Sequence, residues 1–244
     1  MLFLSRRLSW LGLLFAAALA PAMLLAADGS GKVKAAADPT AESVDLFEGI
    51  RNGDLAVKLI PKDSKESRIM IENKTKRPLN VKLPETFAGV PVLAQQQAAP
   101  RQQGIGGGGG GMGMGCIPPE KTESFKVPTV CLEHGKAEPR PTTPYEIRPL
   151  ESFTQNTAVQ EVCRQLGAGQ VNQRVAQAAA WHLNNNMSWE QLAAKRLHHI
   201  NGNFTSYFSL AEIQAAMRVS DAAVEAAAKR SQPAASSASS ASSN

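Results

Sequence analysis

The sequence predicts an α+β fold: a small antiparallel β-sandwich of broadly immunoglobulin-like architecture, followed by a helical C-terminal region. Between about residues 43 and 148, apolar side chains alternate with polar ones, which is the period of strands buried on one face. From about 150 to 230 the spacing is helical, and three helix-start motifs occur. Because strands and helices occupy separate halves of the chain, the pattern allows one α+β fold or two domains.

The strand pattern is clearest at residues 79–83, where leucine and valine alternate with asparagine and lysine. The polar segment 73–78 precedes it and predicts a hairpin turn from the strand before. The antibody-type pattern of cysteine, tryptophan and cysteine is absent, so the immunoglobulin likeness concerns architecture alone. Weaker strand patterns lie at 55–59, 69–71, 125–132 and 145–147.

A glycine-rich segment, about 95–118, interrupts the β half. It contains three consecutive glutamines and a glycine run over 106–111. Such a segment has little apolar surface to bury, so it is predicted to be a disordered insertion between two strands. A phosphate-binding loop would end in Lys-Ser/Thr and lead into a helix. Here Cys-Ile-Pro-Pro follows, which excludes that interpretation.

Three capping boxes mark the helical half, at Thr157–Gln160, Ser188–Gln191 and Ser209–Glu212. In this motif the Ser or Thr and the Glu or Gln three residues later satisfy free N–H groups at a helix start. The pair Ser220–Asp221 is expected to split the last helix in two. The Ser/Ala-rich tail, 231–244, is expected to be disordered.

Residues 1–27 are predicted to be a cleavable signal peptide. Arg6 and Arg7 precede an apolar run that ends in two alanines, the order of a secretory signal. An uncleaved anchor is the main alternative, although the run is short for a membrane span. A lipid anchor is not indicated, because there is no cysteine near the cleavage point. Ser9 disfavours a twin-arginine signal. Residues 28–42 would form a linker in an exported, periplasmic or secreted protein.

The composition argues against two kinds of partner. The formal net charge is +5 and falls to +3 when the two leader arginines are removed. So mild a basic balance predicts no nucleic-acid partner, which would need a clustered basic face. No stretch after the leader is long and apolar enough to cross a bilayer. We therefore expect no stable membrane span after signal cleavage, and at most peripheral association.

The segment Cys131-Leu-Glu-His134 is the candidate functional cluster. A thiol and an imidazole at this spacing suit a nucleophile–base pair or a metal site. However, a zinc site needs about four ligands, and side chains three residues apart on a strand face opposite sides. A turn at Gly135 would relax the second objection. From the sequence we assign no catalytic residue, no metal and no cofactor.

The competing interpretation of this cluster is a disulfide bond. The chain has three cysteines, and export makes a disulfide feasible. A bridge between Cys116 and Cys131 would close a loop of about 15 residues, worth roughly 3 kcal/mol in the chain-entropy model. Cys163 would then be a buried free thiol. A bridge between Cys131 and Cys163 ranks second.

Other residue types with chemical uses are more simply structural. Trp181 and Trp189 are expected in the core of the helical half, with a carbohydrate platform as the alternative. The adjacent His198 and His199 are expected to help a helix C-terminus, because two ligands do not make a metal site.

Four stretches, taken together, resemble a family of exported bacterial proteins of unknown function, over about residues 43–200. The stretches are Asp45-Leu-Phe-Glu-Gly-Ile…Val57-Lys-Leu-Ile-Pro, Ile71-Glu-Asn-Lys-Thr, Val130-Cys-Leu-Glu-His-Gly and Ala176-Gln-Ala-Ala-Ala-Trp-His-Leu. The resemblance implies a periplasmic or secreted bacterial setting. It implies no activity, and no site residues can be carried over.

These observations favour a non-enzymatic binding or structural module of the bacterial cell envelope, with a protein or another envelope component as its partner. The leading reason is that no catalytic constellation is visible. A thiol- or metal-dependent enzyme centred on Cys131 and His134 is the second hypothesis. A carbohydrate or peptidoglycan binder that uses Trp181 and Trp189 is the third.

Overall fold

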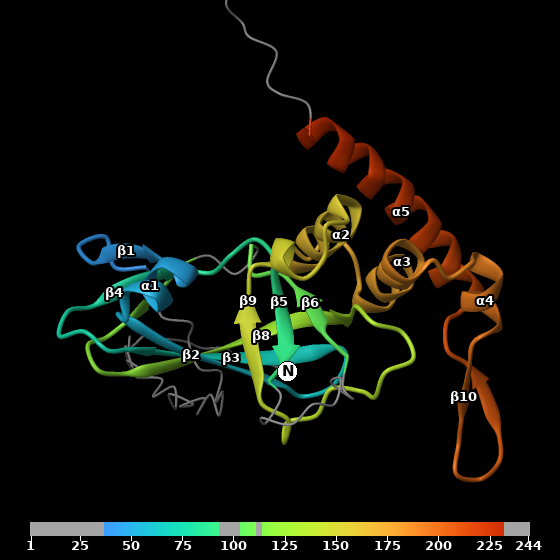
Figure 1. The fold of residues 1–244 in the computed structure, drawn as a ribbon, viewed down its shortest axis with the longest axis horizontal. Coiled ribbons are helices and arrows are strands. Elements are labelled where there is room, and N and C mark those ends of the chain that lie inside the picture. Colours follow the sequence, from blue (N-terminus) through green and yellow to red (C-terminus); the bar gives the residue numbers. More distant parts are fainter. Residues whose placement is uncertain (1–36, 93–102, 111–113, 232–244) are drawn as a thin grey trace, which may run out of the picture. The chain divides into compact units, whose positions relative to one another are not determined.

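Six antiparallel strands close into a β-barrel, in the order β2-β3-β8-β6-β5-β9 (Figure 1). The structure is a computed structural model that describes residues 37–92, 103–110 and 114–231. The predicted signal peptide and nearly all of the predicted tail lie outside these residues. The chain is mixed α+β, but the predicted immunoglobulin-like sandwich is wrong. The last barrel strand pairs with the first, at Leu59 and Tyr145, and this closure leaves no open sheet edge.

The barrel strands differ in length and in how far they pair. Strand β3 pairs with β2 over seven residue pairs and with β8 over seven more, whereas β6 joins β5 and β8 over three pairs each. The interior is filled by the alternating apolar residues that predicted strands. The barrel strands are β2 (Leu55–Pro61), β3 (Glu66–Asn73), β5 (Phe87–Pro91), β6 (Ile105–Gly107), β8 (Thr122–Cys131) and β9 (Tyr145–Arg148).

A second, three-stranded sheet carries the segment with the clearest strand pattern. Strand β4 (Leu79–Lys82) lies between β1 (Glu42–Asp45), which is parallel to it, and β7 (Met114–Ile117), which is antiparallel. The predicted hairpin between β3 and β4 is therefore wrong. Asn73, at the end of β3, explains the departure: its side-chain amide donates to the carbonyls of Arg77 and Ile117 at 2.8 and 3.0 Å. The turn is thereby fixed against β7 instead.

Part of the segment predicted as a disordered insertion forms strand β6, which is buried inside the fold. Gly106 and Gly107 belong to that strand, and Gly108 follows it. A Cβ on Gly108 would lie 2.5 Å from the carbonyl oxygen of Glu85 and 2.7 Å from that of Cys163. The absence of side chains at the end of β6 therefore allows helix α2 (Thr157–Gly167) to approach the barrel backbone directly.

The helices begin close to where the caps predict. The capping box at Ser188 is present, and Ser209 and Glu212 exchange the two corresponding hydrogen bonds. In α2, the first helix of the helical half, the cap is Asn156 and not the predicted Thr157. The predicted break at Ser220–Asp221 is wrong, because the last helix is continuous. The helices are α1 (Leu46–Asn52), α2 (Thr157–Gly167), α3 (Gln173–Asn185), α4 (Trp189–Ala194) and α5 (Leu210–Ser231), with a short 3-10 turn at Leu150–Ser152.

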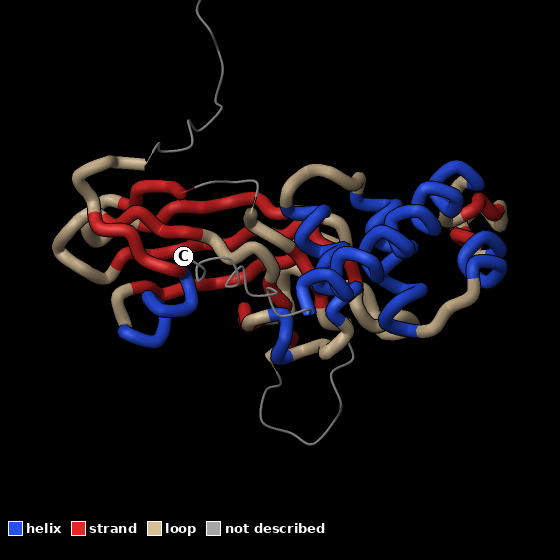
Figure 2. The backbone as a smooth tube through the Cα atoms, turned by 90° about the horizontal axis from the view of Figure 1, so that it is seen from above, coloured by secondary structure: helices blue, strands red, loops and turns tan. Residues whose placement is uncertain are grey.

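The β and α halves share one hydrophobic core, with α2 and α3 packed on the barrel (Figures 1 and 2). A polar ladder on α3, made of Gln173, Gln177 and Asn184, completes the junction. The buried Gln177 accepts from the backbone N–H of Cys131 at 2.8 Å and donates to its carbonyl at 2.9 Å. Gln173 donates to the carbonyl of Thr129, and Asn184 donates to the carbonyl of Leu132. Side chains of α3 thus satisfy the backbone groups at the end of β8 that a neighbouring strand would otherwise bond.

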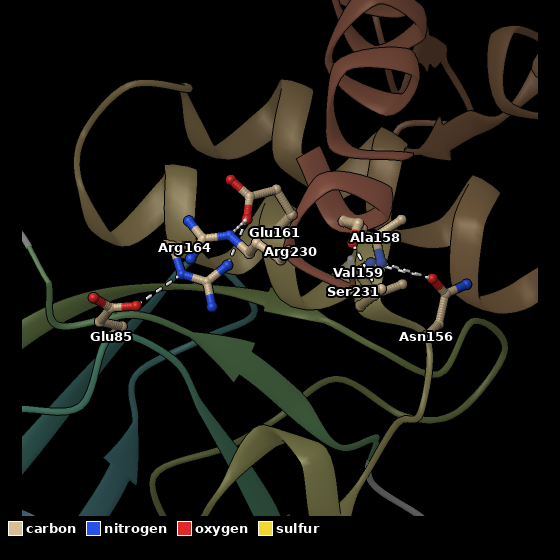
Figure 3. Close-up of polar contacts among 9 residues, drawn as sticks. Glu85, Asn156, Ala158, Val159, Glu161, Arg164, Arg230 and Ser231 are labelled. Carbon is tan, nitrogen blue, oxygen red and sulfur yellow. Dashed lines mark hydrogen bonds and ion pairs between the residues drawn. The ribbon is translucent and has the colours of Figure 1, made fainter. Parts of the chain in front are cut away.

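Ionic contacts fix α2 between the barrel and α5 (Figure 3). The carboxylate of Glu161 is buried and lies within 3.2 Å of Arg230 on α5. Arg164 pairs with Glu161 and also donates to Glu85, ahead of β5, at 2.9 Å. The two arginines supply the counter-charge that a buried carboxylate needs.

The predicted disulfide bond between Cys116 and Cys131 is wrong, and so is the second-ranked bridge to Cys163, because all three cysteines are free. Cys116 and Cys131 are separated by the length of strand β8. Cys116 lies in β7 near the start of β8, and Cys131 is the last residue of that ten-residue strand. An extended strand of this length spans about 30 Å, whereas bridged Cα atoms lie about 4.4–6.8 Å apart.

Two further strands stand apart from both sheets. Strands β10 (Arg196–His198) and β11 (Phe204–Ser206) pair only with each other. Within the residues that the structure describes, no helix is long and apolar enough to cross a membrane.

Candidate functional site

A cleft of about 280 Å³ lies where the loop after β8 meets the helical half. Its walls come from four parts of the chain: Gln103 just before β6, the turn over 134–138, helix α3 at Trp181, and the base of the β10–β11 hairpin with the residues that flank it. Its lining residues are Gln103, His134, Gly135, Lys136, Glu138, Trp181, Lys195, Arg196, Leu197 and Tyr207. The candidate residue His134 therefore lies in this cleft.

The turn that presents His134 is held on two sides. The carboxylate of Glu133 accepts from the N–H of Gly104 at 2.8 Å, just before β6. The N–H of His134 donates to the side-chain carbonyl of Asn185, at the end of α3, at 3.2 Å. Gly135 has a φ of +90°, which other residues rarely adopt. Barrel and helix together set the direction of the imidazole.

Lys195 is the centre of the cleft. Its Nζ lies 3.0 Å from Nε2 of His134, and 5.2 Å from the ring centroids of both Trp181 and Tyr207. Its own carbonyl accepts from the N–H of Tyr207 at 2.8 Å, which fixes the two residues together. The ammonium group is thus placed against two aromatic faces that favour a cation.

The charges around Lys195 leave the cleft with an excess of positive charge. Among the described residues, no carboxylate lies within ion-pair distance of Lys195 or Arg196, whereas Lys136 pairs with Glu133. Glu138 is the only acidic residue in the lining. Two unpaired cations therefore face one carboxylate, an arrangement that favours an anionic ligand.

His134 is held in its neutral form. Burial, and then the charge of Lys195, lower its pKa below the ordinary histidine value. Because an ammonium group only donates, Nε2 must accept, and the ring proton lies on Nδ1. Burial likewise raises the pKa of Tyr207 to about 12, so its hydroxyl stays protonated. Both side chains are uncharged near pH 7.

Two buried polar atoms at the cleft lack a protein partner. In the described part of the chain, neither Oε1 of Gln103 nor Nε1 of Trp181 makes a hydrogen bond. Each residue is 2% exposed. A buried donor or acceptor without a partner carries a free-energy cost. An acceptor and a donor in one lining are therefore groups that a ligand, or ordered water, could satisfy.

Cys131 does not belong to this site. It is fully buried, and burial, followed by the charges of Glu138 and Asp63, raises the pKa of its thiol. The proton-acceptor site of His134 is taken by Lys195. The thiolate is the nucleophile in cysteine chemistry, so burial and a raised pKa both disfavour the thiol–imidazole mechanism.

The remaining predicted residues lie elsewhere. Trp189 stacks on His182, with ring centroids 4.0 Å apart. His199 bonds Thr205 across the hairpin at 2.9 Å, instead of ending a helix. No group of three His, Cys, Asp or Glu side chains within the described ranges could hold a metal ion.

Most of the cleft could not be found from sequence. Lys195 and Tyr207 look like ordinary surface and core residues, and 61 positions separate Lys195 from His134. The available signals were His134 followed by a glycine, which indicated a turn, and Trp181, which was weighed as a carbohydrate-binding residue. The comparisons add no analogy for the site: no family model, no curated protein and no solved structure matches this chain.

Proposed function

We propose that this protein is a non-enzymatic binding module of the bacterial cell envelope, and that its cleft binds a small carboxylate ligand that also carries an amide group. The observation that carries the proposal is the Lys195 ammonium, which faces the cleft without a carboxylate partner. The envelope setting is supported by the leader-like N-terminus, and the bacterial setting only by the resemblance of the four sequence stretches, which no family model matches.

The chemistry of the lining narrows the ligand class. Lys195 and Arg196 suit a carboxylate, and the ring of Tyr207 and the side chain of Leu197, which also line the cleft, suit a small apolar body. The unpartnered acceptor of Gln103 and donor of Trp181 match the N–H and C=O of an amide. Carboxylate, short body and amide together are the C-terminal end of a peptide, which both proteins and cell-wall peptides offer.

Stacking of a sugar on an aromatic side chain fits the cleft less well. The ring of Trp181 is almost wholly buried and already contacts His134, Tyr207 and Phe208. A carbohydrate platform needs an open aromatic face. The third sequence hypothesis therefore has no support from Trp181.

The test is a titration of the purified protein with N-acetylated amino acids, each compared with its uncharged amide. NMR follows the indole N–H of Trp181 and the imidazole of His134. We expect the acids to shift both signals, and the pKa of His134 to rise when an anion binds beside it. Amides should bind at least about tenfold more weakly, the ratio expected for loss of a charged hydrogen bond.

Lys195→Met is the matched variant, with Lys126→Met on the exposed side of β8 as the control. The first should lose most of the affinity and the second none. Removing Lys195 should also raise the pKa of His134, because the neighbouring positive charge lowers it. Equal binding of acids and amides, or equal binding by wild type and Lys195→Met, would reject the proposal.

A further inference from the structure

The β10–β11 hairpin presents apolar side chains to solvent in a way that the rest of the fold does not require. Ile200, at its tip, is fully exposed, and Phe204 and Leu197 are 59% and 41% exposed. All six strand residues are exposed. In Figure 1 the hairpin extends from α4 as a separate arm.

The apolar residues do not share one face. The register pairs His198 with Phe204, and Leu197 with Thr205, so that Phe204 and Leu197 point to opposite faces. Ile200 lies in the connecting loop between them. A protein partner would cover one face of such a hairpin, whereas a lipid layer surrounds an inserted tip on every side.

The charge of the same segment is of one sign. From Gln191 to Ala211 there is no acidic residue, and Lys195 and Arg196 stand at the base of the hairpin. Cations a few residues behind an exposed apolar tip would lie at the level of anionic headgroups when the tip enters the acyl boundary.

Three backbone N–H groups at the tip are satisfied within the hairpin. The N–H of His199 donates to the carbonyl of Asn203, and the N–H of Gly202 donates to the carbonyl of His199, both at 2.9 Å. The N–H of Asn203 donates to the side chain of Asn201 at 3.1 Å. These bonds reduce the cost of moving the loop from water into the headgroup layer.

From these observations we propose that the β10–β11 hairpin is a peripheral docking arm that inserts Ile200 and Phe204 into an anionic lipid bilayer. The cationic base of the arm pairs with the headgroups. The arm shares Lys195 and Arg196 with the cleft lining, but the residues that insert, Ile200 and Phe204, lie outside that lining, so substituting them tests the arm separately from the cleft ligand.

The experiment is flotation of the purified protein with vesicles of phosphatidylcholine alone, or of phosphatidylcholine with about one third phosphatidylglycerol, at low and high salt. We expect binding to the anionic vesicles that weakens at high salt. The double variant Ile200→Asn, Phe204→Asn should bind at least about tenfold more weakly, because it loses two inserted apolar side chains. All proteins carry the same N-terminal segment, so any lipid binding by that segment is common to every sample.

The matched control is Val224→Asn, which removes an apolar side chain of similar exposure, 51%, from α5. It should bind as wild type does. Circular dichroism before flotation verifies that each variant is folded. Equal vesicle binding by wild type and the hairpin variant would overturn the proposal, and so would absence of binding to anionic vesicles. Loss of capture of an envelope protein, with lipid binding unchanged, would assign the arm to a protein partner and also overturn it.

Discussion

Strand β6 and the β10–β11 hairpin are opposites in composition and in burial. Strand β6 has three residues, two of them glycine, and is buried throughout. The hairpin strands have the same length and carry Leu197 and Phe204, yet are exposed throughout. In this chain the apolar strand is therefore outside and the glycine strand inside. The difference teaches that burial depends on what a neighbouring element needs to approach, and not on side-chain hydropathy alone.

The largest expected effect tests the close approach at β6. Gly108→Ala would place a Cβ against two backbone carbonyls that cannot move aside, so we expect a loss of about 2–3 kcal/mol or more in the free energy of unfolding. Chemical denaturation measures it. In the control, Gly110→Ala, the nearest atom is 3.7 Å away, and the loss should stay near zero. Similar midpoints for the two variants would show that α2 does not depend on the glycine contact.

The next largest effect tests the polar ladder. Its side chains bond backbone groups at the end of β8 on the side of α3, whereas β6 pairs with the opposite edge of the same strand. Gln177→Met keeps the volume but leaves the N–H and carbonyl of Cys131 buried without partners, a cost of about 1–3 kcal/mol. The same denaturation assay applies. Gln170→Met, at an exposed position, should have little effect. A loss no greater than that of the control would mean that α3 is held by apolar contacts alone.

The smallest effect is expected at the hairpin. Substituting Ile200 and Phe204 with asparagine removes no buried contact, so the free energy of unfolding should change by no more than about 0.5 kcal/mol. A larger loss would show that the arm stabilises the fold, and the contrast with β6 would then fail. The same two substitutions are the ones expected to weaken vesicle binding, so stability and docking are separable at this site.

Local patterns predicted much of the secondary structure but not the pairing of its strands. The alternation at residues 79–83 correctly predicted a strand, yet β4 pairs with β1 and β7 and not with β3. Alternation reports which residues share a face, and says nothing about which strand lies alongside. The prediction of disorder for the glycine run was wrong at β6 for a related reason. Composition shows only that the run has little apolar surface, whereas its burial comes from the close approach of α2.

Of the residues that line the candidate site, the sequence singled out His134, and Trp181 as part of a carbohydrate platform. The partner of His134 in sequence, Cys131, lies in the barrel with a buried thiol, and its partner in space, Lys195, comes from the end of α4. Contacts across 61 positions leave no local pattern, because nothing in the spacing or composition around either residue depends on the other.

The sequence by itself determined the features that depend on near neighbours: the strand periods, two of the three capping boxes, and the order of the β and α halves. It also predicted the export leader, which lies outside the described residues. Only the tertiary structure decided that the strands close into a barrel, that the cysteines stay free, and that one core joins both halves. These features depend on backbone groups distant in sequence, such as the carbonyls and N–H of β8 that α3 satisfies. Their geometry exists only after the chain has folded.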